Sequence, residues 1–244
     1  MNIFYLSTSP DECARYHCDK HVVKMILETA QMLSTAHATE FKKTQELTTD
    51  GKFSYKYAYV VDKTVAEEKQ IYKGVYPNHP STIWVRDNLC NYLWAYELLE
   101  NLCKEYTFRY NKTHKTESSG VLERLKEPPK LSVNGYAHCG VLTSMEHHFP
   151  PPLCMPDYCK PPFLRDEDSD YYMSGKFSYK DRELWEVQYG LNSGGKDTTM
   201  KAYRKYYLAE KADIARWKKR KKPDWFVEAE SLQKKLSEIT GSVY

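Results

Sequence analysis

The stretch from Cys13 to His37 constrains the fold most, because its residues repeat with the period of an α-helix. At about 100° per residue, one side of this helix is apolar and carries Val22, Ile26, Ala30 and Leu33. The other side is polar and carries His17, Lys20, His21, Lys24, Glu28, Gln31 and Thr35. We expect one long helix with a core face and a face of proton-transfer groups. A plain solvated face is the alternative interpretation.

Asp19 departs from this pattern, because it lies near the apolar side with Ile26, Ala30 and His37. A carboxylate in such a position has either a charged partner or a part in the chemistry. We therefore keep Asp19 beside Glu28 as a candidate catalytic carboxylate.

The composition indicates a cytosolic protein of one large or two small domains. No apolar run approaches 18 residues, and the first ten residues lack the basic and apolar regions of a secretory signal. The seven cysteines are an odd number in a chain that needs no disulfide scaffold, so we expect reduced thiols. The His and Cys residues between 138 and 159 lack the spacing of a closed zinc site, so we expect no metal and no cofactor.

The remaining patterns predict a mainly α-helical fold with long irregular loops and at most short strands. Ser9 and Pro10 begin the first helix, and the turn at Asn78 to Pro80 opens a core helix that runs through Arg109. Residues 40–78 are left open between a loop and a short strand. Residues 116–196 form a Pro-rich loop region inside a domain at 1–226, and a last amphipathic helix occupies 227–244.

Positive charge is concentrated near the end of the chain. Between Lys201 and Lys222, ten Lys and Arg residues stand against two acidic ones, although the whole chain carries only +3. We expect one helix from Lys196 or Asp197 to Lys218 that carries most of these cations. Tyrosines and a tryptophan alternate with them, which is the mixture that nucleic-acid binders use to neutralise phosphates and stack on bases. A solvated basic helix with an aromatic packing face is the competing interpretation.

Gly-rich phosphate loops and the common hydrolase motifs are absent from the sequence, which leaves most enzyme classes without support. A helix with His, Lys and carboxylate groups, a His-Pro turn and a basic aromatic block are what a base-excising enzyme needs. It must grip phosphates, extrude a nucleotide and stabilise the positive sugar that forms as the base leaves.

The order of these parts resembles the phage endonuclease V family of pyrimidine-dimer DNA glycosylases. The matching pieces are LSTSPDECARYH with His17, NHPSTIW with His79 and Pro80, the helix through Glu105 to Arg109, and AYRKYY at 202–207. The block HCDKHVVKMILETAQ also resembles proteins of phages and large viruses. The resemblance implies a small, mainly helical enzyme that acts on double-stranded DNA through a histidine, an essential glutamate and an amine. It also implies a setting in which the base is damaged or is a modified phage cytosine.

Two departures from the family pattern guide the choice of residues. The family uses the amine exposed when Met1 is removed, but Asn2 is too large for efficient removal, so we expect Met1 to stay. The essential glutamate corresponds to Glu28 or, nearer the start, to Asp19. We therefore expect either carboxylate to stabilise the sugar cation or activate water, Lys20 or Lys24 to supply a lyase amine, and His17 and His21 to orient or protonate.

The expected DNA contacts combine cations with aromatic and turn residues. They are Arg15, Asn78, His79, Trp84, Arg86, Arg109, Lys112, His114, Arg204, Lys205, Tyr206, Tyr207, Trp217 and Lys218. Three functions remain open on the sequence. The first is a DNA N-glycosylase, the second is a base- or nucleotide-modifying transferase, and the third is a DNA-binding protein without catalysis.

Overall fold

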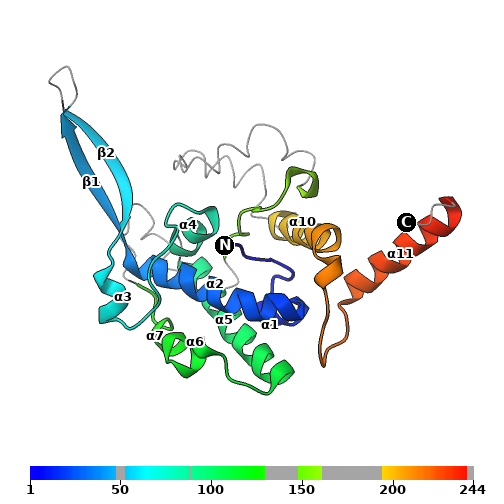
Figure 1. The fold of residues 1–244 in the computed structure, drawn as a ribbon. Helices are drawn as coiled ribbons and strands as arrows, with labels where there is room; N and C mark the ends of the chain where they lie inside the picture. The colour runs from blue at the N-terminus through cyan, green and yellow to red at the C-terminus, as the bar shows by residue number, and fades with distance from the viewer. Residues whose placement is uncertain (48–52, 88, 130–147, 161–193, 241–244) are drawn as a thin grey trace.

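The computed structural model describes residues 1–47, 53–87, 89–129, 148–160 and 194–240. The described residues are mainly helical, as predicted, and two strands form one small antiparallel sheet (Figure 1). The expected contents of residues 130–147 and 161–193 lie outside the described residues. Three of the predicted helices have different limits in the structure, each for a reason visible in its contacts.

The first predicted helix consists of two helices, α1 (Pro10–Tyr16) and α2 (Asp19–Ala38). The Ser9 side chain caps α1 as predicted, and Pro10 stands in its first turn. The break follows from competition for backbone groups. In one continuous helix the carbonyl of Arg15 would accept from the N–H of Asp19. Instead, Arg109 Nη2 donates to Arg15 O at 2.9 Å, and Asp19 N donates to Arg216 O at 2.7 Å.

Helix α2 nevertheless buries the predicted apolar side. Val22, Ile26, Ala30 and Leu33 are fully buried against α5 (Leu89–Tyr110) and α4 (Pro80–Asp87). The expected single helix after the His-Pro turn is thus the pair α4 and α5. The Asn91 side-chain amide donates to Trp84 O at 3.0 Å. In a continuous helix this carbonyl would accept from a backbone N–H four residues later.

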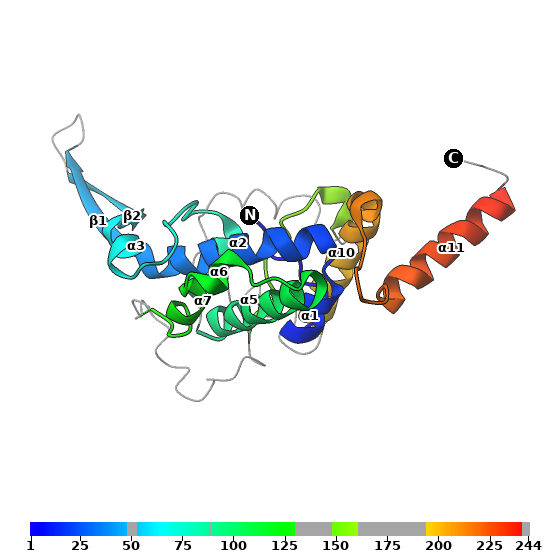
Figure 2. The same cartoon turned by 60° about the horizontal axis from the view of Figure 1, so that its bottom comes forward.

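Residues 40–78, which the sequence left open, contain a β-hairpin. Strands β1 (Thr39–Leu47) and β2 (Phe53–Val61) pair antiparallel, with Thr39 opposite Val61. The hairpin extends away from one end of α2 (Figures 1 and 2). The short helix α3 (Thr64–Glu68) follows the hairpin, and two more short helices, α6 (Lys115–Ser118) and α7 (Val121–Arg124), follow α5.

The basic block forms a shorter helix than predicted. Helix α10 (Gly194–Glu210) ends before Lys218, and the chain continues through 3-10 helix η4 (Ala212–Ile214) into an irregular segment. The backbone N–H of Lys218 binds the Asp19 carboxylate and Lys219 has a φ of 61°, so neither residue continues a helix. Pro223 precedes α11 (Asp224–Thr240), which extends away from the helical body (Figure 2). Helix α11 begins before the predicted residue 227, because Phe226 is buried against Trp217 and belongs to its first turn.

Candidate active site

The first residues of the chain form an extended segment that lies between α2 and α10 (Figure 1). Ile3, Phe4, Tyr5 and Leu6 are buried, and the Phe4 ring stacks on His21 of α2 with a centroid distance of 4.3 Å. The segment is extended, but no strand pairs with it among the described residues. Because this segment is buried, it holds the first residues of the chain beside the middle of α2.

Glu28 on α2 faces the start of the chain. Its Oε2 accepts a hydrogen bond from the backbone N–H of Asn2 at 3.1 Å, and its Oε1 lies 3.2 Å from Lys24 Nζ. The Glu28 side chain is 15% exposed, whereas the Lys24 side chain is 65% exposed. The Glu28 carboxylate is therefore mostly shielded from solvent, and each of its oxygens contacts one nitrogen, from Asn2 or from Lys24.

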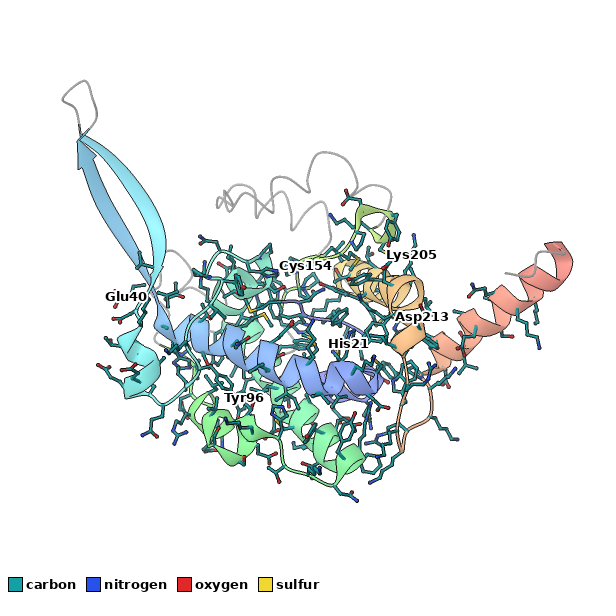
Figure 3. All side chains as sticks on the ribbon, in the orientation of Figure 1. His21, Glu40, Tyr96, Cys154, Lys205 and Asp213 are labelled. Atoms are coloured by element: carbon teal, nitrogen blue, oxygen red, sulfur yellow. The ribbon has the colours of Figure 1, made fainter. Side chains whose placement is uncertain are left out.

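The side chain of Asn2 holds this arrangement in place. Its Nδ2 donates to Cys154 O at 2.8 Å, and its Oδ1 accepts from the Tyr203 hydroxyl of α10 at 2.9 Å. The Tyr203 hydroxyl also lies 2.6 Å from Pro152 O. Figure 3 shows Cys154 and His21 in the region between α2 and α10. The 3-10 helix η2 (Asp157–Cys159) follows Cys154, so three parts of the chain meet at Asn2.

His79, at the start of α4, completes the group. Its Nδ1 accepts from the backbone N–H of Ser81 at 3.2 Å, so the ring proton of the neutral form is on Nε2. Burial and the positive charge of the chain's amino terminus lower the pKa of His79, and Glu28 raises it. These interactions place His79, the terminal amine and Glu28 within electrostatic reach of one another. At neutral pH His79 is an uncharged donor beside a carboxylate.

His17 and His21, which the sequence placed on the catalytic face, are buried. His17 Nδ1 donates to Cys13 O at 2.7 Å, and His21 Nδ1 lies 2.6 Å from the Tyr207 hydroxyl. Burial lowers the pKa of His17 to about 4 and that of His21 to about 3. Both rings are therefore neutral at pH 7, and they pack the first segment against α2 and α10. The assignment of catalytic roles to them stays a prediction.

Asp19 has the charged partner that its position demanded. Its Oδ1 lies 3.0 Å from Arg109 Nη1 and accepts from Lys218 N at 2.9 Å. Asp19 is nine residues before Glu28, which places the two side chains on opposite sides of α2. Lys20 is exposed and lies next to Asp19, one helical turn before Lys24. Of the two lysines predicted to supply a lyase amine, Lys24 is the one that contacts Glu28.

Arg109 was predicted to contact DNA, and the structure places its side chain in the interior, so its role at DNA stays a prediction. Its side chain is fully buried, with Nε 2.9 Å from Glu105 Oε2 and Nη1 donating to His17 O at 2.8 Å. Arg220 belongs to the basic segment, residues 218–222 between η4 and α11. It contacts the same carboxylate, with its Nε 3.1 Å from Glu105 Oε1. A guanidinium committed to these partners is not available to a phosphate. It locks the joint between α1 and α2 to the basic segment.

Four further predicted DNA contacts are buried inside the protein, and their roles at DNA stay predictions. Trp84 donates to Phe149 O, Trp217 donates to Tyr16 O, and Arg86 donates to Pro77 O. The fourth is Tyr207, whose hydroxyl binds His21 and the backbone N–H of Cys18. An aromatic ring in such a position cannot stack on a base without leaving the core.

The other predicted DNA contacts keep surface that a phosphate can reach. They are Arg15, Asn78, His79, Lys112, His114, Arg204, Lys205, Tyr206 and Lys218. Arg15 pairs with Asp11 at 2.8 Å, and His114 Nδ1 accepts from Thr116 N to cap α6. Lys218 lies over the Tyr110 ring at 5.6 Å. Their roles in binding DNA stay predictions.

Sequence reasoning missed Asn2, Tyr203 and Cys154 as parts of the site. Asn2 figured only as a bulky residue after Met1, and Tyr203 only as one aromatic residue of the basic block. Residues 2 and 203 meet through a hydrogen bond that joins opposite ends of the chain. No local pattern signals such a contact.

Other classes of site are not indicated in the described part of the chain. No three His, Cys, Asp or Glu side chains gather there as metal ligands, and the six described cysteines are free thiols. His138, Cys139 and His147 lie outside the described residues. None of the described helices is both long and apolar enough to cross a membrane.

Comparison with known proteins places this geometry in context. Residues 1–118 match the family model described as pyrimidine dimer DNA glycosylase. No curated protein and no solved structure matches the chain. The matched part contains Asn2, Glu28 and His79 but ends before the basic segment. The match confirms the predicted resemblance over residues 1–118 and supports a pyrimidine dimer DNA glycosylase-type function.

Proposed function

We propose that the protein is a DNA N-glycosylase that removes a damaged or modified pyrimidine and leaves an abasic site. The observation that carries the proposal is the contact between Glu28 Oε2 and the backbone nitrogen of Asn2 at 3.1 Å. It joins a carboxylate to the start of the chain within the residues that match the glycosylase family. Cleavage of an N-glycosyl bond needs such a pairing of a carboxylate with a nucleophile or a water molecule.

Glu28 is the carboxylate of the proposed reaction. When the bond between C1′ and the base nitrogen breaks, the electron pair leaves with the base and positive charge develops on the sugar. A carboxylate within a few ångströms stabilises that charge more strongly in a shielded site than in water. Asp19 is less suited to this role, because Arg109 and Lys218 N already occupy its oxygens.

Two amines near Glu28 are candidates for a covalent route. Lys24 Nζ is one, and the terminal amine is the other, since its charge acts on both His79 and Cys154. Loss of Met1 would turn the Asn2 nitrogen that contacts Glu28 into a primary amine. In this route the amine nitrogen bonds to C1′ as the base departs, and ring opening gives a Schiff base. Water then releases the abasic sugar, or β-elimination breaks the strand.

His79 is the proposed hydrogen-bond donor to the departing base. Its Nδ1 accepts from Ser81 N, so the neutral ring presents its Nε2–H as a donor. A lowered pKa keeps the ring uncharged at pH 7, and an uncharged imidazole stabilises developing negative charge by a hydrogen bond without giving up its proton. The base leaves with the bonding electron pair, and a water molecule supplies the proton that it needs.

The test is a panel of DNAs incubated with the purified protein: undamaged, ultraviolet-irradiated, uracil-containing, and carrying hydroxymethylated or glucosylated cytosine. Abasic sites are scored with an aldehyde-reactive probe before and after alkali. We expect abasic sites on one substrate, and a loss of about 10²- to 10⁴-fold in rate for Glu28→Gln with DNA binding retained. Glu100→Gln, on an exposed surface pair with Lys104, is the matched control and keeps full activity.

The same experiment separates the alternatives. Salt-sensitive DNA binding without abasic sites on any substrate would move the assignment to a non-catalytic binder or to a transferase that needs a donor. Equal rates for Glu28→Gln and the native protein would refute the role of this carboxylate. Borohydride trapping followed by peptide mapping identifies the amine, because a cross-link at the terminus persists in Lys24→Gln and a cross-link at Lys24 does not.

A further inference from the structure

The solvent-facing side of α2 carries two apolar residues that the core does not use. Val23 and Leu27 leave 39% and 41% of their surface exposed, whereas Val22 and Ile26 beside them are fully buried. Residues four apart are neighbours on a helix surface, so Val23 and Leu27 form one apolar pair. Single exposed apolar residues are common on protein surfaces, but this pair lies beside the candidate site.

Cations flank the apolar pair on the same side of α2. Lys20 and Lys24 are exposed and, at about 100° per residue, lie within the same surface strip as Leu27. Lys24 pairs with Glu28, so the strip ends at the candidate catalytic carboxylate. An apolar pair with lysines along one side fits a polyanion that also offers apolar contacts, which is the chemistry of a DNA duplex with stacked bases.

The basic segment borders the apolar pair on the side away from Glu28. Asp19, one helical turn before Val23, accepts from Lys218 N, and Lys219 Nζ donates to Asn111 Oδ1 at 2.8 Å. The exposed cations of α2 and those of the basic segment are therefore held in a fixed relation by hydrogen bonds. This continuity of positive charge favours DNA as the occupant of the strip.

We propose that Leu27, supported by Val23, is a wedge that enters the DNA duplex and fills the space left by the extruded nucleotide. The inference rests on the proposed glycosylase function and assigns a positioning role beside Glu28. Enzymes that bend or open DNA insert apolar side chains between base steps and thereby offset the cost of unstacking. Leu27 and Glu28 lie at nearly the same height on α2 but about 100° apart around it, so a wedge at Leu27 leaves the extruded nucleotide on the side of the helix toward Glu28.

The test compares Leu27→Ala with the native protein on a duplex and on a single strand, each containing one thymine dimer. We expect a single-turnover rate about tenfold lower on the duplex and an unchanged rate on the single strand, where there is no stack to fill. Leu27→Met, which restores apolar volume, should recover most of the duplex rate. The matched control is Leu232→Ala on α11, where the leucine is 61% exposed. Equal rates on the duplex, or an equal loss on both substrates, would overturn the wedge.

A second readout keeps this inference separate from the proposed function. The fluorescence of 2-aminopurine next to the dimer rises when neighbouring bases unstack. We expect binding of Glu28→Gln to raise it and binding of the double variant Glu28→Gln with Leu27→Ala to leave it unchanged. If the native protein releases no base but the two variants still differ in this way, the wedge stands and the glycosylase function fails. If Leu27→Ala instead abolishes a dimer in gel filtration and leaves the fluorescence rise intact, the pair is a protein contact and the wedge fails.

Discussion

Replacement of Arg109 by Met is the sharpest test of how the structure assigns its charged residues. Arg109 is fully buried and donates to Glu105, Asp19 and the carbonyls of Arg15 and His17. Met keeps much of the apolar volume but removes all of these donors. Breaking a buried ion pair from one side costs about 3–5 kcal/mol, because the remaining charge and carbonyls lose their partners.

This free energy converts into a measurable loss of thermal stability. For a chain of this size each kcal/mol lowers Tm by about 2–4 °C, so Arg109→Met should melt about 6–20 °C below the native protein. Lys104→Met is the matched control, since the Lys104–Glu100 pair is exposed and contributes about 0.5 kcal/mol or less. Circular dichroism melts and urea titrations at pH 7 measure both variants. Arg109→Lys should fall between them, because an ammonium cannot reproduce the guanidinium fork.

The opposite result would restore the sequence-based assignment. If Arg109→Met is as stable as Lys104→Met but binds DNA much more weakly, Arg109 is a phosphate contact. The buried network would then be wrong. A variant that melts early yet binds DNA normally at low temperature agrees with the structure.

The Ser9 cap, the two buried histidines of the α1–α2 region and the exposed lysines of the basic block each give a further prediction. Ser9→Ala should cost about 1 kcal/mol in urea titrations by removing the α1 cap, whereas Ser9→Gly should cost only a few tenths. Because the folded pKa values of His17 and His21 lie near 4 and 3, below the unfolded value, stability is complete above about pH 6.5 and falls as pH drops toward 4. The slope is at most about 1.4 kcal/mol per pH unit for each histidine, and a shallower slope in His21→Gln would be the check. Lys218 and Lys221 are exposed lysines of the basic block, so Lys218→Ala and Lys221→Ala should each lower the salt slope of DNA binding by about 1. An unchanged slope would remove the residue from the interface.

Local patterns predicted the elements whose causes are local. The apolar repeat of Val22, Ile26 and Leu33 marks the buried face of α2, and Ser9 with Pro10 marks the start of α1. These signals depend on residues within one or two turns of each other. Propensity and spacing are therefore sufficient to detect them.

The helix breaks had distant causes and could not be predicted in this way. The joint between α1 and α2 depends on Arg109, more than ninety residues along the chain. Lys218, predicted to be helical, is held outside a helix by Asp19, which its backbone N–H contacts across 199 residues. Such contacts appear only once the helices are packed. The burial of Arg109 and Trp217 could not be predicted for the same reason, because charge and aromaticity signal a binding surface and a buried contact equally well.

The candidate site was predicted in part. The polar side of α2 named Glu28 and Lys24 correctly as neighbours, since they lie one turn apart. Choosing Glu28 over Asp19 required the partner of each carboxylate. Asn2, the partner of Glu28, reaches it only because the buried segment from Ile3 to Leu6 fixes the start of the chain.

Asp19 and Glu28 together predict how far the DNA contact of the basic segment lies from the candidate site. Asp19 holds the backbone of Lys218, and Glu28 lies nine residues later on the same helix, a rise of about 13 Å. The two side chains also lie on opposite sides of α2, so this rise is the least distance between them. Phosphates along one strand are about 3.4 Å apart along the axis, so on the proposed function a phosphate bound by Lys218 should lie at least about four nucleotides from the extruded base. Neutral methylphosphonates at single positions would locate this contact. Weakened binding about four nucleotides to one side of the target fits the docked basic segment, whereas a contact at the target itself would require the segment to leave Asp19.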